Sequence, residues 1–339
     1  MIKTKWTGKA TSSLLLSGLV TVLSSALAQA APGQPTAGQM TFQDPATPIA
    51  EQIQWFHNSL VNPIIVGITV FVMLLMAYVM WRFSEKRNPT PSRTSHNTAL
   101  EVAWTVIPIA ILLIIAIPSF RLLYAQYSYP KPDLTIKAVG NAWFWEHEYP
   151  DNGNVKVTSN MITDEELIKA KLGDAEFNKK FAGLGGTDRT KALHEAATPL
   201  WLNAPDKYAG SRLVRQLSVD NEIAVPVNKT VHLLVTSNDV IHSWTIPSFG
   251  SKVQAVPGRI TATWFKPTKE GIYYGQCSVL CGKEHSSMPI AVRVVSDKAF
   301  NDWLAAAKAK DWKRARAILA SATEGKEPKT VAELTGGQQ

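Results

Sequence analysis

Residues 276–289 read Gln-Cys-Ser-Val-Leu-Cys-Gly-Lys-Glu-His-Ser-Ser-Met-Pro and contain both cysteines of the 339-residue chain. Cys277, Cys281, His285 and Met288 place two thiols, an imidazole and a thioether within 12 residues. Thiolate, thioether and imidazole are the soft ligands that select copper. Since a single-copper electron-transfer site needs only one cysteine, the second thiol indicates a site in which two thiolates bridge two metals.

The alternative interpretation of two cysteines in an exported protein is a disulfide. A Cys277–Cys281 bridge would close a five-residue loop and would stabilise the fold little. The histidine and methionine that follow favour a metal site instead. A second imidazole must then come from elsewhere in the chain, and His242, which starts a β-prone run, is the best candidate. Weaker candidates are His147, His194 and His232.

The copper motif lies in a hydrophilic region, from residue 127 to the C-terminus, that must fold outside the membrane. Short runs rich in Thr, Val, Ile and Tyr recur there between turn residues such as Pro257, Gly258 and Pro267. The runs are residues 134–139, 214–219, 230–236, 260–265, 272–275 and 290–295. Short β-prone runs between turn signals predict an antiparallel sandwich or barrel.

Two segments of this region are predicted to be helical instead. Residues 162–195 are charged and helix-prone around a glycine cluster at 183–186, and we interpret them as an insertion on the surface of the domain. Residues 297–319 have an amphipathic pattern that would turn Phe300, Trp303 and Leu304 toward the domain. We therefore assign the exported domain to residues 127–305, followed by a C-terminal helix and polar tail at 306–339.

Two apolar runs precede the exported region. Residues 63–82 and 104–125 are 20 and 22 residues long. At about 1.5 Å per residue each would form a helix about 30 Å long, enough to cross the hydrocarbon core of a bilayer. Aromatic residues that settle at membrane interfaces stand at their ends, namely Trp81, Trp104 and Tyr124. Residues 31–126 are thus predicted to hold an N-terminal segment and a two-helix transmembrane hairpin.

The N-terminus and the positive charges set the orientation of this hairpin. Residues 1–30 have a basic start, an apolar run and the small-residue motif Ala28-Gln29-Ala30, which predict a cleaved secretory signal peptide. The loop at 82–100 carries four Lys or Arg residues, whereas residues 31–62 carry none. Because positive loops stay inside, the β domain is predicted to lie on the periplasmic, outer side of a bacterial plasma membrane.

The formal net charge of +8 resides mainly in the same two segments. The signal peptide and the loop at 82–100 each contribute +3, which leaves +2 for the rest of the chain. No dense basic face with interleaved aromatic residues occurs in the sequence. Nucleic acid is therefore excluded as a partner class.

Taken together, the signal peptide, two spans and exported β domain with this copper motif resemble cytochrome c oxidase subunit II, a family within the haem-copper oxidases. Further matching motifs are Gly140-Asn-Ala-Trp143-Phe-Trp145, Val219-Asp220-Asn221, Asp239-Val-Ile-His242-Ser-Trp244, Pro257-Gly258-Arg259, Gly271-Ile-Tyr273-Tyr274-Gly275-Gln276 and Glu101-Val-Ala-Trp104-Thr105. The resemblance covers residues 45–160 and 212–305 and leaves out the insertion and the tail.

The resemblance implies an α+β membrane protein whose exported part is a cupredoxin-like β-barrel with the binuclear copper centre CuA. In the family pattern Cys277 and Cys281 bridge both coppers, His242 and Met288 complete one, and His285 and the backbone carbonyl of Val279 complete the other. Position 279 departs from the family, which usually has a glutamate there that helps to bind magnesium. We therefore expect residue 279 to ligate copper through its main chain but not to bind magnesium.

The resemblance also implies roles beyond the copper ligands. Trp143 matches the tryptophan through which the family accepts electrons from cytochrome c. Acidic positions that dock a basic cytochrome c through salt-sensitive steering are matched by Glu148, Asp220 and Asp239. Glu101, at the cytoplasmic start of the second span, matches a carboxylate at the entrance of a proton path.

By the same resemblance, the chain would accept electrons from cytochrome c at CuA and pass them to haem in subunit I, for oxygen reduction coupled to proton pumping. The expected partners are cytochrome c, oxidase subunits I and III and membrane lipid. One alternative is the copper-free subunit II of a quinol oxidase, against which the complete ligand set argues. Another is a soluble CuA enzyme such as nitrous oxide reductase, against which the two spans argue. A fused cytochrome c would need Cys-x-x-Cys-His, which the sequence lacks.

Overall fold

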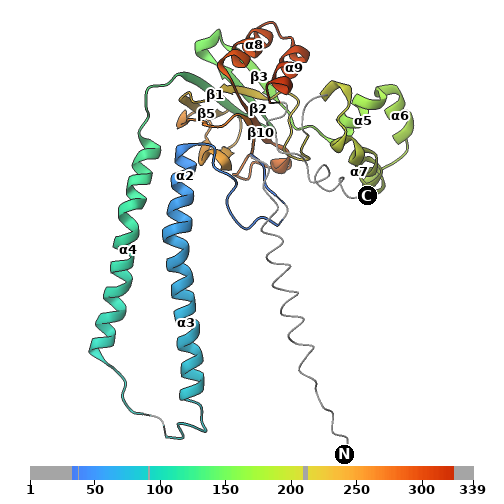
Figure 1. Cartoon of the computed structure of the whole chain (residues 1–339). Coiled ribbons are helices and arrows are strands. Elements are labelled where there is room, and N and C mark those ends of the chain that lie inside the picture. Colours follow the sequence, from blue (N-terminus) through green and yellow to red (C-terminus); the bar gives the residue numbers. More distant parts are fainter. Residues whose placement is uncertain (1–32, 37, 91, 209–212, 324–339) are drawn as a thin grey trace, which may run out of the picture.

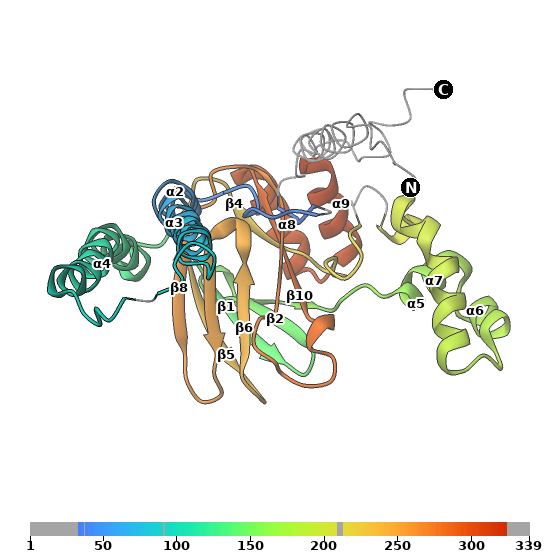
Figure 2. The ribbon, with the colours of Figure 1, turned by 90° about the horizontal axis from the view of Figure 1, so that it is seen from below.

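The computed structural model describes residues 33–36, 38–90, 92–208 and 213–323 (Figure 1). Two long helices run side by side away from a β domain, and a group of short helices lies at the side of that domain (Figures 1 and 2). The predicted signal peptide and most of the predicted polar tail lie outside the described residues.

The two predicted spans are the long helices of Figure 1. The first passes without a break from α2 (Pro48–Trp55) through the π-helical segment η2 (Phe56–Val61) into α3 (Asn62–Arg82), and the second is α4 (Thr98–Tyr127). No residue of their most apolar stretches is buried in the isolated chain, which leaves these stretches accessible to lipid or to a partner subunit. Both spans are confirmed, and both are longer than the apolar runs that predicted them.

The outer end of the first span is anchored in the β domain. The side chain of Thr47 caps α2 by accepting a hydrogen bond from Ala50 N at 3.1 Å, and its hydroxyl donates to Phe249 O at 2.8 Å. Ile49 and Ala50 are buried against the domain. The β domain is therefore held to the membrane hairpin by packing as well as by chain continuity.

The β domain contains two main sheets and a hairpin. The larger sheet has the order β3 (Val155–Ser159), β2 (Phe144–Tyr149), β1 (Leu134–Asn141), β5 (Val231–Ser237), β8 (Thr261–Phe265). The smaller sheet has the order β4 (Ile223–Pro226), β10 (Pro289–Val295), β9 (Gly271–Gln276), and the hairpin joins β6 (His242–Ile246) to β7 (Ser251–Ala255). Alternate residues of β1 and β5 are buried, and they pack with the smaller sheet in one core.

Three predictions about the strands are corrected by the structure. The sheets are mixed rather than antiparallel, because β1 pairs with β5 in parallel and β4 pairs with β10 in parallel. Parallel pairs need long connections, and the chain between β1 and β5 includes a hairpin and the helical insertion. The strands form a cupredoxin-like sandwich of separate sheets rather than a closed barrel. Residues 214–219 form a turn with one isolated bridge at Val219 instead of a strand.

The remaining α-helices form two groups, one at the C-terminal end of the described chain and one in the insertion. The predicted C-terminal helix is two helices, α8 (Asp297–Lys308) and α9 (Trp312–Thr323), separated by Lys310, whose φ of 57° lies in the left-handed region. As predicted, Phe300, Trp303 and Leu304 of α8 are buried, and Ala306 and Ala307 are buried with them. The insertion consists of α5 (Asp164–Leu172), α6 (Asp174–Phe181) and α7 (Gly186–Leu202), which share a small core of their own.

Candidate metal centre

The proposed copper motif is the loop between the antiparallel strands β9 and β10. Cys277 N donates a hydrogen bond to Met288 O at 3.0 Å, which ties the two ends of the loop together. A second loop, between β5 and β6, approaches it and ends at His242, the first residue of β6. Ser278 N donates to Ser243 O at 3.3 Å and joins the two loops directly beside the cysteines.

These loops bring together the side chains that the sequence analysis singled out. Cys277 Sγ lies 3.8 Å from Cys281 Sγ, 3.9 Å from His242 Nδ1 and 3.3 Å from Val279 O. On the other side, Cys281 Sγ lies 3.5 Å from His285 Nδ1. The two sulfurs are much farther apart than the roughly 2.05 Å of a disulfide, and both cysteines are free. One imidazole thus stands beside each sulfur.

Burial separates this cluster from water. Cys277, Cys281 and Met288 are 5%, 7% and 1% exposed, and His242 is completely buried. The ligand atoms of His242, Cys277 and Cys281 all lie within 4.8 Å of one another. A compact, dry group of soft donors is the environment that a copper electron-transfer site requires.

The two thiols differ in acidity. Burial by itself raises the pKa of Cys277, but hydrogen bonds with the His242 ring and with the backbone of Ser243 and Val279 lower it below its usual value. Burial and the negative charge of Cys277 raise the pKa of Cys281. A bound metal must therefore displace a firmly held proton from Cys281. Metal affinity at this site should fall as the pH is lowered.

Trp143 packs on the loop at the residue that follows Cys281. A Cβ atom added to Gly282 would lie 3.4 Å from Trp143 Nε1 and 3.5 Å from Cζ2, which is ordinary contact distance, so the indole packs directly on the backbone of this residue. The φ of Gly282 is 119°, in the region that favours glycine. The Trp143 side chain is half-buried and comes from the turn between β1 and β2. A half-buried aromatic ring from the β1–β2 turn thus packs on the β9–β10 loop beside Cys281, one of the candidate ligands.

The predicted docking acids and Glu101 lie in different surroundings. Glu148 forms ion pairs with Lys137 at 3.1 Å and with Lys156 at 2.5 Å, and the hydrogen bond from Lys156 is the main cause that holds its pKa low. Asp220 accepts hydrogen bonds from Asn160 N and Asn221 N, both at 2.8 Å. Glu101 is in the first turn of α4. Of the three acids, only Asp239 contacts a candidate ligand: its Oδ1 lies 2.7 Å from His242 Nε2.

The three weaker histidine candidates lie outside the cluster. His232 Nε2 is 2.6 Å from Pro130 O, and His194 Nδ1 in the insertion is 3.7 Å from Asp164. His147 is fully buried on β2, where its Nε2 accepts a hydrogen bond from Trp244 Nε1 at 3.2 Å. Sequence reasoning missed this structural role for His147. Burial lowers its pKa to about 3, so the ring is neutral in the folded protein.

We expect His147→Gln to flatten the pH dependence of the free energy of unfolding. The unfolded chain protonates His147 below a pKa of about 6.5, whereas the folded protein keeps it neutral down to about pH 3. Its stability contribution is complete above pH 6.5 and is lost as the pH falls toward 3, by about 1.4 kcal/mol per pH unit. Urea unfolding of the copper-free chain across this window measures the slope, with the exposed His194→Gln as control. If the free energy of unfolding depended on pH in the same way in wild type and His147→Gln, the prediction would be contradicted.

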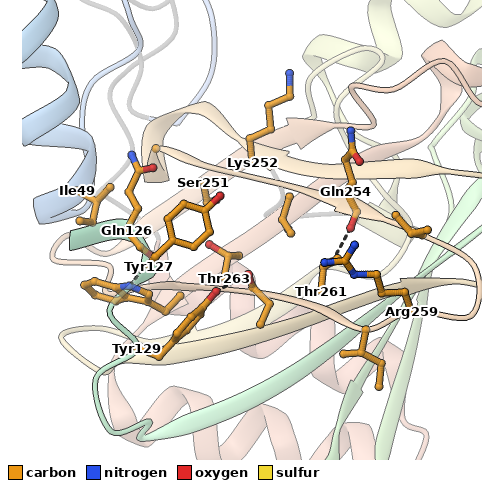
Figure 3. A pocket seen from close by; sticks show the side chains of 16 residues that line it. Ile49, Gln126, Tyr127, Tyr129, Ser251, Lys252, Gln254, Arg259, Thr261 and Thr263 are labelled. Atoms are coloured by element: carbon orange, nitrogen blue, oxygen red, sulfur yellow. Dashed lines mark hydrogen bonds between the residues drawn. The ribbon is translucent and has the colours of Figure 1, made fainter. Parts of the chain in front are cut away.

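A polar cavity of about 490 Å³ lies apart from this cluster, where the outer end of α4 meets β7 and β8 (Figure 3). Its lining includes Tyr127, Tyr129, Lys252, Gln254 and Arg259. None of the candidate copper ligands lines it. The candidate metal ligands thus lie on the two loops. The cavity lies at the junction between the membrane hairpin and the β domain.

Both halves of the chain match models of one protein family. Residues 35–122 match the transmembrane domain of cytochrome c oxidase subunit II, and residues 134–182 and 202–295 match its periplasmic domain. The chain belongs to the cytochrome c oxidase subunit II family. The family match runs through residue 182 and so includes α5 and α6, which the sequence motifs had left outside the resemblance.

Relatives named as subunit 2 extend over most of the chain. A probable cytochrome c oxidase subunit 2 of Rickettsia conorii is 42% identical over 299 residues, covering 88% of this chain and 78% of the relative. The cytochrome c oxidase subunit 2 of Cereibacter sphaeroides is 42% identical over 276 residues, covering 81% and 82%. The solved periplasmic domain of subunit II from Bradyrhizobium japonicum is 41% identical, with a TM-score of 0.39, covering 54% of this chain and 99% of that domain.

Family membership fixes the role of the protein at the level of the complex. It is subunit II of a cytochrome c oxidase, part of an oxidoreductase complex, and it associates with other oxidase subunits. It is anchored by two apolar helices and carries an exported domain. The copper-free quinol oxidase alternative is not supported. The family implies copper, and the cluster of His242, Cys277 and Cys281 is compatible with a copper site.

Proposed function

We propose that this subunit II accepts single electrons from cytochrome c at a binuclear CuA centre and passes them to haem in subunit I, where oxygen is reduced and protons are pumped. The observation that carries the proposal is the pair of free thiols, 3.8 Å apart, with one imidazole beside each. Two thiolates at that separation can both contact two metals, whereas a mononuclear site has no use for the second.

The donor set fits two coppers. Cys277 and Cys281 would be shared, His242 and Met288 would complete the first set, and His285 and Val279 O would complete the second. When bound, such a centre takes up and releases one electron that is shared by two metals. The protein keeps water away from the sulfurs, and the short β9–β10 loop fixes the donor positions. Because the donors are already in place, little rearrangement would accompany each electron transfer.

Electrons would enter through Trp143, which packs against the loop beside Cys281. Cytochrome c would be guided by Glu148, Asp220 and Asp239. Two lysines flank Glu148 and offset its charge, whereas in the described part of the chain no lysine or arginine forms an ion pair with Asp220 or Asp239. We therefore assign the larger share of steering to these two aspartates. Steering between exposed charges weakens with salt.

The membrane part supports the remaining assignments. Subunits I and III and lipid would cover the exposed apolar faces of α3 and α4, with aromatic residues at the interfaces. Glu101, half-buried in the first turn of α4, would stand at the cytoplasmic entrance of a proton path. Residues 1–30 would be removed on export. Val279 carries no carboxylate, so we propose that the chain supplies no magnesium ligand at that position.

Copper loading of the full-length chain in detergent tests the proposal. We expect two coppers per chain by metal analysis and one unpaired electron shared by both in spin resonance. Lowering the pH should release copper, because the Cys281 thiol regains its proton. A single localised copper, or a Cys277–Cys281 disulfide in the copper-loaded protein, would overturn the proposal.

A further inference from the structure

The carboxylate of Asp239 lies directly behind the candidate ligand His242. Its Oδ1 is 2.7 Å from His242 Nε2, and the same oxygen accepts hydrogen bonds from Val240 N at 2.6 Å and from Ser237 Oγ at 3.1 Å. The loop thus holds one carboxylate oxygen in place from its own backbone and from the end of β5. That oxygen is fixed toward the imidazole before any metal binds.

The His242 ring is also confined on its other sides. A Cβ atom on Gly140 would come within 2.7 Å of the ring carbon Cδ2, so the absence of a side chain there makes room for the imidazole. The Trp145 ring packs edge-on at 6.0 Å between centroids. The His242 side chain is 0% exposed. Gly140, Trp145 and Asp239 therefore leave the ring one orientation, with Nδ1 toward Cys277.

The other imidazole, that of His285, has different surroundings. His285 is half-buried, and its Nδ1 faces Cys281 Sγ at 3.5 Å. Within the described part of the chain, no carboxylate or carbonyl accepts a hydrogen bond from its Nε2. The two sides of the candidate copper cluster are thus chemically unequal, and the inequality comes from Asp239.

We propose that Asp239 is a positioning residue that acts through His242, in addition to any part in docking. A carboxylate only accepts hydrogen bonds, so the proton of the neutral ring stays on Nε2 and the lone pair is on Nδ1, facing the thiols. An oxygen that accepts the Nε2 proton, whether from a carboxylate or from an amide, also fixes the ring and makes the imidazole a better electron donor to a metal. His242 would therefore bind copper more strongly than His285, an inference that rests on the proposed function of the cluster.

Docking and positioning can use different atoms of the same carboxylate. Oδ1 carries the bonds to His242, Val240 and Ser237, while the side chain as a whole is 32% exposed. The remaining oxygen can face a cationic partner. Loss of cytochrome c affinity in a variant would thus not distinguish the two roles, and the test must separate the charge of the carboxylate from its hydrogen bond.

Asp239→Asn and Asp239→Ala separate these properties in the full-length chain. Asparagine loses the charge but keeps an oxygen that can accept from His242 Nε2, whereas alanine loses both. We expect Asp239→Ala to weaken copper binding by about 10- to 100-fold in competition with a chelator, as removal of such partners does. We expect Asp239→Asn to stay within about threefold of wild type, and only the alanine variant to change the nitrogen hyperfine couplings of the oxidised centre.

Glu148→Gln is the matched control, because it removes an acidic charge from the same proposed docking set without touching a candidate ligand. Its copper affinity should equal that of wild type. If Asp239→Asn and Asp239→Ala behave alike, whether both weaken copper binding or neither does, the positioning role is refuted. Thermal unfolding of the copper-free variants checks that each is folded. Failure of wild type to bind two coppers would instead refute the proposed function.

Discussion

Cys277→Ser is expected to abolish the shared-electron copper signal and to leave at most one copper per chain. Cys277 Sγ is the atom nearest to most of the other donors, at 3.3 Å from Val279 O, 3.8 Å from Cys281 Sγ and 3.9 Å from His242 Nδ1. Serine has nearly the same shape, but its hydroxyl does not ionise near neutral pH and is a hard ligand that copper disfavours. Without a second bridge, two metals cannot be held together.

The loss of oxidase turnover should exceed the roughly 10- to 100-fold that removal of a ligand's supporting partner causes, because a direct ligand is removed. Metal analysis and spin resonance of the full chain, followed by oxidation of reduced cytochrome c by the assembled complex, measure both effects. Ser278→Ala is the matched control: Ser278 is the next residue and is exposed, and among the described residues its hydroxyl bonds only to Ser243 and Thr245. Two coppers sharing an electron in Cys277→Ser would contradict the bridging role.

The elements that the sequence predicted correctly are those whose signal is local. The spans at 63–82 and 104–125 need only length and apolarity, and they appear as α3 and α4. Five of the six β-prone runs, all except residues 214–219, coincide with strands, namely β1, β5, β8, β9 and β10. In these strands the branched or aromatic residues that favour extended backbone are also the ones that fill the core.

The wrong strand predictions arise where tertiary contacts determine the backbone conformation or the strand pairing. Residues 214–219 are apolar enough for a strand, but Val214 N is hydrogen-bonded to Ser218 Oγ at 2.8 Å and the segment turns back on itself. Leu217 and Val219 are still buried, against β9 and β10. A buried segment that pairs with no strand can have the same apolar composition as a strand, so composition alone predicted a strand here. Likewise, the parallel partners of β1 and β4 come from distant parts of the chain and leave no local signal.

At the candidate site, too, the features with a local sequence signal were predictable and those that depend on tertiary contacts were not. Four donors lie in one short loop, so their spacing alone indicated a metal centre, and the start of a β-prone run singled out His242 as the second imidazole. The surroundings of His242 were not predictable from spacing, because Gly140 and Trp145 come from another hairpin. The sequence did contain a weak sign of the Asp239 contact, since Asp239 and His242 are three residues apart. Because the conformation of the loop was not known from the sequence, the spacing did not predict that the Asp239 carboxylate would face the His242 ring.

Trp143→Ala is expected to slow electron transfer from cytochrome c by roughly 100-fold, the scale of effect that misplacing a reacting group produces, while the copper signal stays intact. The indole is half-buried and lies against Gly282, next to Cys281. It is therefore an aromatic bridge between the surface and the candidate ligands. Since the indole makes no hydrogen bond to a candidate copper ligand within the described chain, its removal should lengthen the electron path without removing a donor.

The loss should appear in kcat at saturating cytochrome c, and KM should change less, because the steering charges remain. Loss of a docking acid should show the opposite pattern, with a KM effect that fades as salt is raised. Trp201→Ala serves as the matched control, since Trp201 is also half-buried but lies in the insertion, where its Nε1 donates to Asp164 at 2.7 Å. Unchanged turnover in Trp143→Ala would show that electrons do not enter through the ring. Loss of the copper signal would show instead that the ring supports the loop.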